Sequence, residues 1–329
     1  MREGWDASGP WRRTGLLFSA LCLLIGAGGF WLHFTRIPLG PLVNAAAFAP
    51  YLMAVSLVGL ATALIVRSGR LVGGGLLVVL VSLCTQAPLY LDSSDGAEPE
   101  LTVLQINLGL GEGDVDALAD VVNTEEVDLL AVTELTEPAL AAIESSSILR
   151  RLPHAYTRPA RAGNGGGILS RYPITERTRL DGFWLPNLRT VIDVPGAAPL
   201  TFYGLHVMPP YPDTSAQWRS ELGRLHAEFR GATGPVIAAG DYNATYDHRA
   251  FRALTAPAPT GPAMLDAAEH TGAGMVRTYP ADRFFPPLLA LDRILARGGP
   301  EPIEFRRIAI PDSDHHAVLA RFRGSPDRR

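Results

Sequence analysis

The sequence predicts an α/β domain that follows three membrane-spanning helices. All long apolar runs fall before Asp92, and from about Glu98 onward polar and apolar residues mix as in a globular domain. The 329 residues exceed one typical domain, and a hydrophobic content of 47% is high for a wholly soluble protein. We therefore expect a membrane anchor over residues 1–91, a linker over 92–100, a globular domain over 101–323 and a tail over 324–329.

Three apolar runs in the first part have the length of membrane spans. Residues 15–34, 48–66 and 71–91 hold about 20 residues each, enough for a helix to cross roughly 30 Å of hydrocarbon. A cleaved signal peptide is the alternative for the first run, and a buried helical hairpin of a soluble domain is the alternative for the other two.

Arginine asymmetry predicts the orientation of these spans. Arginines precede the first span and separate the second from the third, whereas the loop between the first two has only Arg36. The positive-inside rule then places the N-terminus in the cytoplasm and, after three spans of the cell membrane, the globular domain outside it. The arginines on the expected cytoplasmic side are Arg2, Arg12, Arg13, Arg67 and Arg70, and the acidic residues after the third span are Asp92, Asp95, Glu98 and Glu100.

Charge and cysteine content weigh against a nonspecific nucleic-acid-binding protein and against a disulfide-stabilised domain. The chain has no lysine, a net charge of −4 and no basic block, which weighs against nonspecific nucleic-acid binding. Cys22 and Cys84 both lie in the apolar runs, so disulfides are not expected to stabilise the globular part.

The globular part opens with a βαβ pattern and continues with alternating strands and helices. Polar residues follow several of the strands, at the edge where sites of α/β proteins usually form. Taken singly, each is more often a turn former, a helix cap or a solvated surface residue. Strands are expected at about 101–108, 127–132, 167–170, 190–194, 200–205, 236–239, 292–296, 304–309 and 317–322, and helices at 115–123 and 215–230.

Six short motifs are informative in combination. LQINLG contains Asn107, VTEL contains Glu134, YGLHVMP contains His206, GDYN contains Asp241 and Asn243, LDRIL contains Asp292, and SDHH contains Asp314 and His315. In this order they resemble the endonuclease/exonuclease/phosphatase superfamily over residues 101–322. The resemblance implies a four-layer α/β sandwich, in which two mixed sheets pack face to face with helices outside, and a divalent-metal site at one end of the strands.

The resemblance also implies the metal ligands. Glu134 would be the principal Mg²⁺ ligand, with Asn107 beside it and Asp314 close to the metal or reached through water. Mn²⁺ is the alternative ion. Oxygen ligands of this kind suit magnesium, which retains waters and binds phosphate oxygens. Gly109 departs from the nuclease members, which carry an acidic residue there, and this tilts the prediction away from DNA repair.

The remaining implied roles concern the phosphoryl group. Asp241 and Asn243 would orient or activate the attacking water, and His315, paired with Asp292, would contact the phosphoryl oxygens. His206 would make a second phosphate contact. Two arginines at family positions, Arg171 and Arg189, are predicted to support the site or bind substrate, with an ordinary surface role as the alternative.

Three spans before such a domain resemble the VanJ-type teicoplanin-resistance membrane proteins. This resemblance implies dephosphorylation of undecaprenyl pyrophosphate, so the expected partners are a lipid-linked phosphate or pyrophosphate and the membrane, with no protein partner indicated. An extracytoplasmic nuclease or lipid phosphodiesterase with the same site stays open, as does a catalytically silent binding domain. The apolar stretches 183–186 and 284–289 are expected either at the mouth of the site or in the core.

Overall fold

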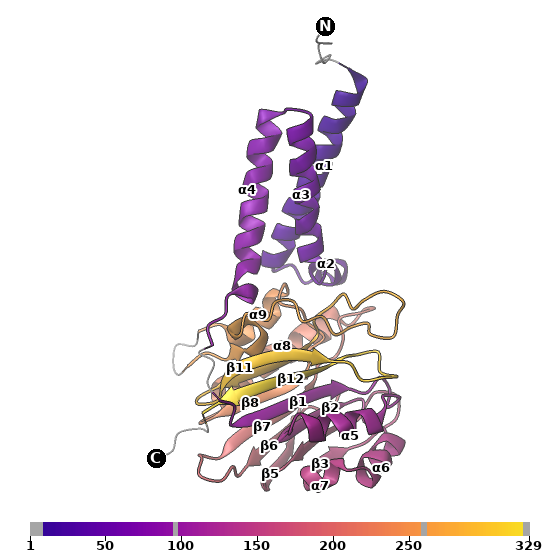
Figure 1. Ribbon diagram of the computed structural model, residues 1–329, viewed down its shortest axis with the longest axis vertical. Helices are drawn as coiled ribbons and strands as arrows, with labels where there is room; N and C mark the ends of the chain where they lie inside the picture. Colours follow the sequence, from indigo (N-terminus) through magenta and orange to yellow (C-terminus); the bar gives the residue numbers. More distant parts are fainter. Residues whose placement is uncertain (1–8, 95–97, 258–261, 325–329) are drawn as a thin grey trace. The chain divides into compact units, whose positions relative to one another are not determined.

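The computed structural model describes residues 9–94, 98–257 and 262–324. Contacts divide the chain into two compact units, one of Met1–Pro88 with Asp247–Arg249 and one of Leu89–Tyr246 with Ala250–Arg329. Residues 95–97 of the expected linker and 325–329 of the expected tail lie outside the described residues, and so do Arg2 and Asp95 of the orientation argument. Figure 1 labels the helices and strands.

The first unit is helical and apolar. It contains α1 (Pro10–Phe34), α2 (Gly40–Ala46), α3 (Ala49–Ile65) and α4 (Gly69–Gln86), which the short 3₁₀ helix η1 (Ala87–Tyr90) extends. By length and composition, Pro10–Phe34 and Gly69–Tyr90 are long and apolar enough to cross a membrane. The second expected span corresponds to the 17-residue helix α3, which would make a third span only together with α2, as one broken helix bent by 66°. Pro50 lies in the first turn of α3 and favours a new helix start there.

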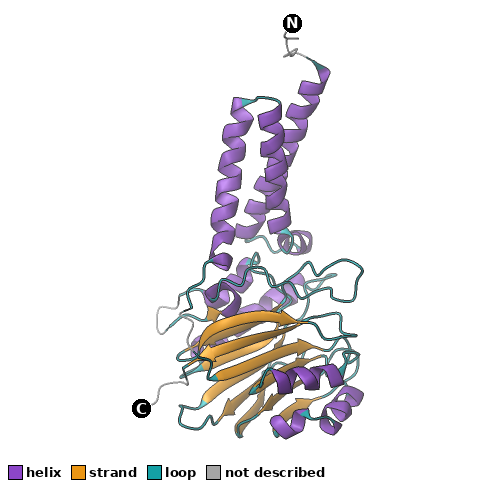
Figure 2. Cartoon of the chain, in the orientation of Figure 1, coloured by secondary structure: helices purple, strands orange, loops and turns teal. Residues whose placement is uncertain are grey.

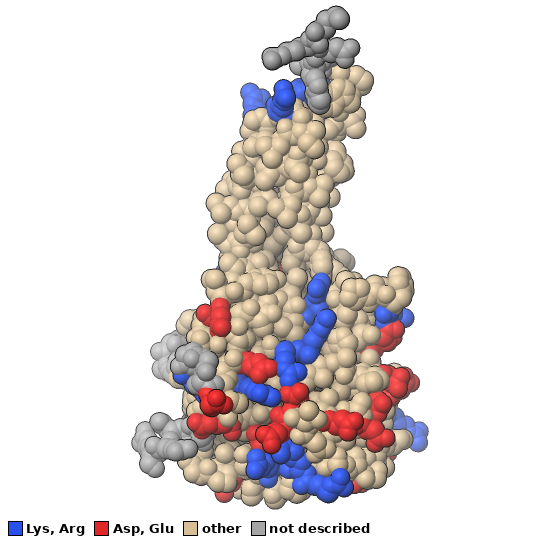
Figure 3. Space-filling model, in the orientation of Figure 1, with Lys and Arg blue, Asp and Glu red and all other residues tan. Residues whose placement is uncertain are grey.

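Small residues let the helices of this unit approach closely. A Cβ on Gly26 would lie 2.5 Å from Ser56 Cβ, and a Cβ on Gly29 would lie 2.7 Å from the carbonyl oxygen of Ala49. The Ser19 hydroxyl donates to the Gly59 carbonyl at 2.8 Å. Close glycine and serine contacts are typical of helices that pack within a bilayer. On the face drawn in Figure 3 these helices show uncharged side chains along their length and basic ones gathered near the N-terminus.

The second unit contains two mixed six-stranded sheets (Figure 2), as predicted. Only the pairs β1–β2 and β7–β8 are parallel, and all other neighbours are antiparallel. The first sheet has the order β11 (Glu301–Ile308), β12 (Ala317–Arg323), β1 (Leu101–Asn107), β2 (Leu129–Thr133), β4 (Gly166–Ser170), β3 (His154–Arg158). The second has the order β5 (Ile174–Arg179), β6 (Leu188–Ile192), β7 (Leu200–His206), β8 (Val236–Asp241), β10 (Asp292–Arg297), β9 (Leu265–Asp266).

The inner faces of the two sheets form one core, in which Val103 and Ile168 of the first sheet join Phe202, Ile237 and Ile294 of the second. Helices cover the outer faces. The first sheet is covered by α5 (Val115–Thr124), α6 (Glu137–Ser145) and α7 (Ile148–Arg151), and the second by α8 (Ser215–Gly231), with α9 (Arg249–Thr255) and α10 (Ala267–His270) in the later connections. The fold is therefore an α/β sandwich of two mixed sheets flanked by helices.

Candidate active site

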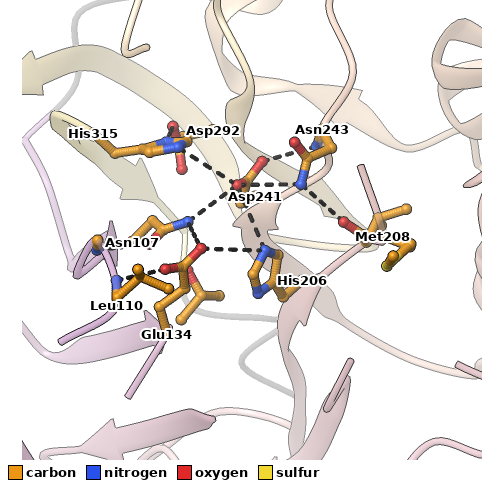
Figure 4. A network of polar contacts seen from close by, with 12 residues as sticks. Asn107, Leu110, Glu134, His206, Met208, Asp241, Asn243, Asp292 and His315 are labelled. Atoms are coloured by element: carbon orange, nitrogen blue, oxygen red, sulfur yellow. Dashed lines mark hydrogen bonds and ion pairs between the residues drawn. The ribbon is translucent and has the colours of Figure 1, made fainter. Parts of the chain in front are cut away.

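The alternation that builds the core also positions the site. In β1, β7, β8 and β10 every second side chain faces the opposite sheet. At one end of the strands this inward series changes from apolar to polar residues. The apolar and the polar member of each series are Val103 and Asn107 in β1, Phe202 and His206 in β7, Ile237 and Asp241 in β8, and Ile294 and Asp292 in β10. The four polar side chains are buried and converge between the sheets (Figure 4).

Glu134 directly follows β2 and lies beside Asn107. The Asn107 amide donates to Glu134 Oε1 at 3.1 Å and to Asp241 Oδ2 at 3.2 Å, which links the two sheets. The backbone N–H of Leu110 donates to Glu134 Oε2 at 2.5 Å. The φ of Glu134 is +56°, a strained value for a residue with a side chain, of the kind that often occurs at functional sites.

Asp241 ends β8, and Asn243 lies in the turn that follows. The backbone N–H of Asn243 donates to Asp241 Oδ1 at 2.8 Å, and its side-chain amide donates to the Val207 carbonyl at 2.9 Å. Burial, reinforced by the charge of Asp292, raises the pKa of Asp241 to about 7. A carboxylate with such a pKa is suited to accept a proton near neutral pH.

His315 lies opposite, in the loop before β12. Its Nδ1 is 2.8 Å from Asp292 Oδ2, and Asp292 Oδ1 accepts from the Gln105 amide at 3.0 Å. Burial alone would lower the pKa of His315, but Asp292 and Asp241 outweigh it and raise this pKa to about 10. The imidazole is therefore a cation at neutral pH. Its Nε2 atom lies 3.9 Å from Asp241 Oδ2.

His206 completes the cluster and, unlike His315, is uncharged. Its Nε2 is 3.9 Å from Glu134 Oε1 and 3.8 Å from Asp241 Oδ2. Burial, and then the charge of His315, lower its pKa to about 3, so the ring is neutral. The Asn187 side chain fixes the backbone here, since it donates to the His206 carbonyl at 2.9 Å and accepts from the His206 N–H at 3.1 Å.

The carboxylates of Glu134 and Asp314, with the Asn107 side-chain oxygen, are the predicted ligands of a divalent cation. Burial raises the pKa of Asp314, and the charge of Glu134 raises it further, so a cation would offset a local excess of negative charge. A Cβ on Gly109 would lie 2.8 Å from Asp314 Oδ1, so the Asp314 carboxylate occupies the space of the missing acidic residue. Hard oxygen donors of this kind suit Mg²⁺.

A second arrangement of candidate metal ligands lies nearby. Ligand atoms of Asp241, Asp292 and His315 lie within 4.8 Å of one another. A protonated imidazole has no free lone pair, however, and Asp292 already accepts from both His315 and Gln105. The donor chemistry therefore favours a metal on the Glu134 side of the site, where Asn107 and Asp314 remain the predicted companions.

Two of the predicted residues lie elsewhere. Arg171 follows β4 at the end remote from the site and pairs with Asp128 at 3.1 Å. Arg189 faces outward from β6 and lies 3.4 Å from Glu228 of α8. The substrate-binding role predicted for both is corrected to a structural one, because each side chain is directed to an ion pair outside the site.

Sequence reasoning also missed residues that support the site. Gln105 lies two positions before Asn107 and so faces the same side of β1. A polar side chain within a buried strand was the sequence signal that could have identified it. Ser313 receives the His315 N–H at 3.1 Å and donates to the Asn107 carbonyl at 2.7 Å. Tyr279, whose ring centroid is 4.8 Å from that of His315, had no local signal.

Known proteins resemble this chain at the level of family and of fold. The model of the Endonuclease/Exonuclease/phosphatase family matches residues 104–315. No curated protein matches the chain. The structure of D. rerio TDP2 humanized by 14 mutations is 17% identical, with a TM-score of 0.54 over 68% of this chain and 98% of that chain. An endonuclease/exonuclease/phosphatase from Bacteroides vulgatus is 13% identical, with a TM-score of 0.54 over 68% of this chain and 98% of that chain. A likeness at these identities extends to the fold alone.

Proposed function

Because the chain belongs to the endonuclease/exonuclease/phosphatase family, whose members are metal-dependent phosphoesterases and nucleases, we propose that it is a membrane-anchored, Mg²⁺-dependent phosphatase. Its substrate in this proposal is a lipid-linked pyrophosphate of the undecaprenyl type, presented outside the cytoplasm. The same combination of spans and domain resembles the VanJ-type teicoplanin-resistance membrane proteins, which supports this choice of lipid.

The observation that carries the lipid substrate is a set of exposed apolar side chains around the site. Each lies on a loop that meets a strand at its site end: after β1, between β5 and β6, after β7, or before β10. In this proposal, these side chains at the site end of the strands provide the apolar contact for the lipid or for the membrane surface. Among the described residues after Leu91, the strongly exposed large apolar side chains are Leu110 (55%), Trp184 (68%), Tyr211 (72%) and Phe284 (100%).

The helical unit supports the proposed location. Pro10–Phe34 and Gly69–Tyr90 have the length and composition of spans, and the bent pair α2–α3 would supply the third. With three spans, the arginines at the N-terminus and between α3 and α4 place those ends in the cytoplasm and the domain outside. A tethered domain meets a lipid head group at high effective concentration, so anchoring favours turnover of this substrate.

Each of the site residues has a separate role in the proposed reaction. Asp241, held by Asn107 and Asn243, accepts a proton from the attacking water and orients it. Protonated His315 donates from Nε2 to a phosphoryl oxygen while Asp292 fixes its ring. Neutral His206 donates a second hydrogen bond to the same group. Glu134, Asn107 and Asp314 would hold a Mg²⁺ ion, which would supply Lewis-acid stabilisation of the phosphoryl charge.

A nuclease or a lipid phosphodiesterase would use the same groups, so a substrate panel is the decisive test. One structural neighbour is D. rerio TDP2 complexed with single-strand DNA product, to which this chain is 17% identical. Purified full-length protein in detergent with Mg²⁺ is offered polyprenyl pyrophosphate, a phosphodiester lipid, and single-stranded or abasic DNA. We expect polyprenyl pyrophosphate to be hydrolysed with the highest kcat/KM.

Two variants sharpen the panel. Asp241→Asn should lower the hydrolysis rate of every substrate by about 10², and Asp193→Asn, an exposed carboxylate outside the site, is its matched control. Tyr211→Ser with Phe284→Ser should reduce turnover of the long-chain lipid more than turnover of a water-soluble ester. Preferential hydrolysis of DNA, insensitive to the Tyr211 and Phe284 changes, would refute the lipid substrate.

A further inference from the structure

A surface cleft of about 720 Å³ lies beside Glu134, on the side of β3 and β5. Its lining includes Arg158, Arg179, Asn164, Trp184, Glu137 and Thr157. We propose that this cleft binds a second phosphate group of the substrate, distinct from the phosphoryl group attacked next to Asp241. The inference rests on the proposed phosphoesterase activity and adds to it a determinant of substrate choice.

Backbone contacts place one wall of the cleft next to the site. The N–H of Ala160 donates to the Leu135 carbonyl at 3.0 Å, and the N–H of Leu135 donates to the Gly165 carbonyl at 3.3 Å. A Cβ on Gly163 would lie 3.3 Å from Glu134 Cδ, so this loop packs directly on the predicted metal ligand.

Strand pairing gives the reach of Arg158. Arg158 pairs with Gly166, and Gly166 pairs with Thr133, the residue before Glu134. Two strand spacings separate the backbones of Arg158 and Thr133, about 10 Å. A long arginine side chain can span much of that distance toward a group bound at Glu134.

The opposite wall comes from the second sheet. Arg179 ends β5 and pairs with Leu188, which in turn pairs with Gly204, two residues before His206. Trp184 and Pro186 follow in the loop between β5 and β6. The cleft therefore borders both Glu134 and the strand end that carries His206.

A buried carboxylate holds the Trp184 wall in place. Glu221 of α8 is fully buried and accepts from the backbone N–H groups of Trp184 and Met208, each at 2.9 Å. The Gln217 side chain donates to the same carboxylate at 2.8 Å. The backbone of Trp184 is thus fixed while its ring is exposed, as expected of a preformed binding surface.

Charge and hydrogen-bonding capacity identify the ligand. Arg158 and Arg179 are exposed and form no ion pair with any residue that the structure describes. The Arg158 guanidinium lies 5.6 Å from the centroid of the Tyr156 ring, a contact that does not use its N–H groups as hydrogen-bond donors to an acceptor oxygen. Guanidinium groups bind phosphate through paired hydrogen bonds, and the Asn164 amide adds a donor. Two cations exceed the single carboxylate of Glu137, so the cleft selects an anionic group. The Trp184 ring would cover the apolar or planar part attached to it.

The test compares substrates that carry one or two phosphate groups. Full-length protein in detergent hydrolyses polyprenyl pyrophosphate and, separately, bis(p-nitrophenyl) phosphate. For Arg158→Ala with Arg179→Ala, the ratio of the two kcat/KM values should fall about tenfold, through KM of the pyrophosphate, as expected for loss of charged hydrogen bonds. Arg177→Ala is the matched control, since Arg177 is exposed on the same strand but does not line the cleft.

Each outcome decides the proposal. An unchanged ratio, or an equal loss on both substrates, would overturn the cleft as a phosphate subsite. If polyprenyl pyrophosphate is not hydrolysed at all, the same ratio is measured for a thymidine oligonucleotide against bis(p-nitrophenyl) phosphate. A tenfold fall there would support the cleft while refuting the lipid substrate, and no fall would refute both.

Discussion

Replacing Asp292 with Asn tests whether His315 acts as a cation. The Asp292 carboxylate lies 2.8 Å from His315 Nδ1 and is fully buried, so it is the strongest influence that keeps this imidazole protonated. Asn preserves the shape of the side chain and removes the charge. Burial, which lowers the pKa of His315, is then opposed only by the charges of Asp241 and Asp314, and this pKa should fall from about 10 toward its ordinary value of 6.5.

The expected loss of rate follows from the two protonation states. In the parent protein, Asp241 with a pKa of about 7 and His315 with a pKa of about 10 are both in their active forms in ~90% of molecules near pH ~8.5. With the pKa of His315 at 6.5, that fraction peaks at ~13% near pH ~6.8. Because loss of the Asp292 charge also removes one cause of the raised pKa of Asp241, the maximal rate should fall by up to about sevenfold, and the optimum should move to lower pH.

The assay is the pH dependence of kcat/KM between pH ~5 and ~11, for bis(p-nitrophenyl) phosphate and full-length protein. Asp312→Asn, an exposed carboxylate in the same loop as His315, is the matched control and should keep the parent profile. An Asp292→Asn profile that still declines only near pH 10 would refute the assignment. The raised pKa of His315 also stabilises the fold, fully below pH 6.5 and progressively less as pH rises through about 10.

Three further predictions concern the metal, the water and the topology. Glu134→Ala should abolish turnover and weaken Mg²⁺ binding measured by calorimetry, whereas Glu112→Ala, an exposed carboxylate nearby, should do neither. Asp241→Asn should lower the single-turnover rate by about 10² while binding of a non-hydrolysable polyprenyl pyrophosphate analogue stays close to normal. A reporter fused after Arg329 should be active only outside the cytoplasm.

Contrary results would be equally informative. Full activity of the purified protein in excess chelator would exclude the metal role of Glu134. Near-normal turnover by Asp241→Asn would exclude it as the base, and a reporter active in the cytoplasm would exclude the proposed orientation and the lipid head group with it.

Apolar runs predicted most of the strands, whereas the sandwich of two sheets was implied by the family resemblance of the motifs. The sequence analysis missed β5 (Ile174–Arg179), since ITERTR is largely exposed and polar and owes its extended form to pairing with β6. It placed the second apolar run at residues 48–66, where the structure has the single helix α3, but it did not foresee α2 before that run or the 66° bend between α2 and α3.

Motifs at strand ends identified the residues that converge, because strand alternation carries them inward together. The motifs could not show with which residue a long side chain forms its ion pair. Arg171 and Arg189 both occupy family positions, yet Asp128 and Glu228, distant in the sequence, hold them away from the site. The roles of the converging residues remain predictions until the variants above are measured.

Three contacts in the site join one sheet to the other. Asn107 of β1 donates to Asp241 of β8, and Gln105 of β1 donates to Asp292 of β10. His315, which precedes β12, also pairs with Asp292. A slight sliding of one sheet over the other would break these contacts while each sheet kept its own hydrogen bonds. Core substitutions between the sheets, such as Ile168→Val, should therefore reduce activity at temperatures at which the domain is still folded.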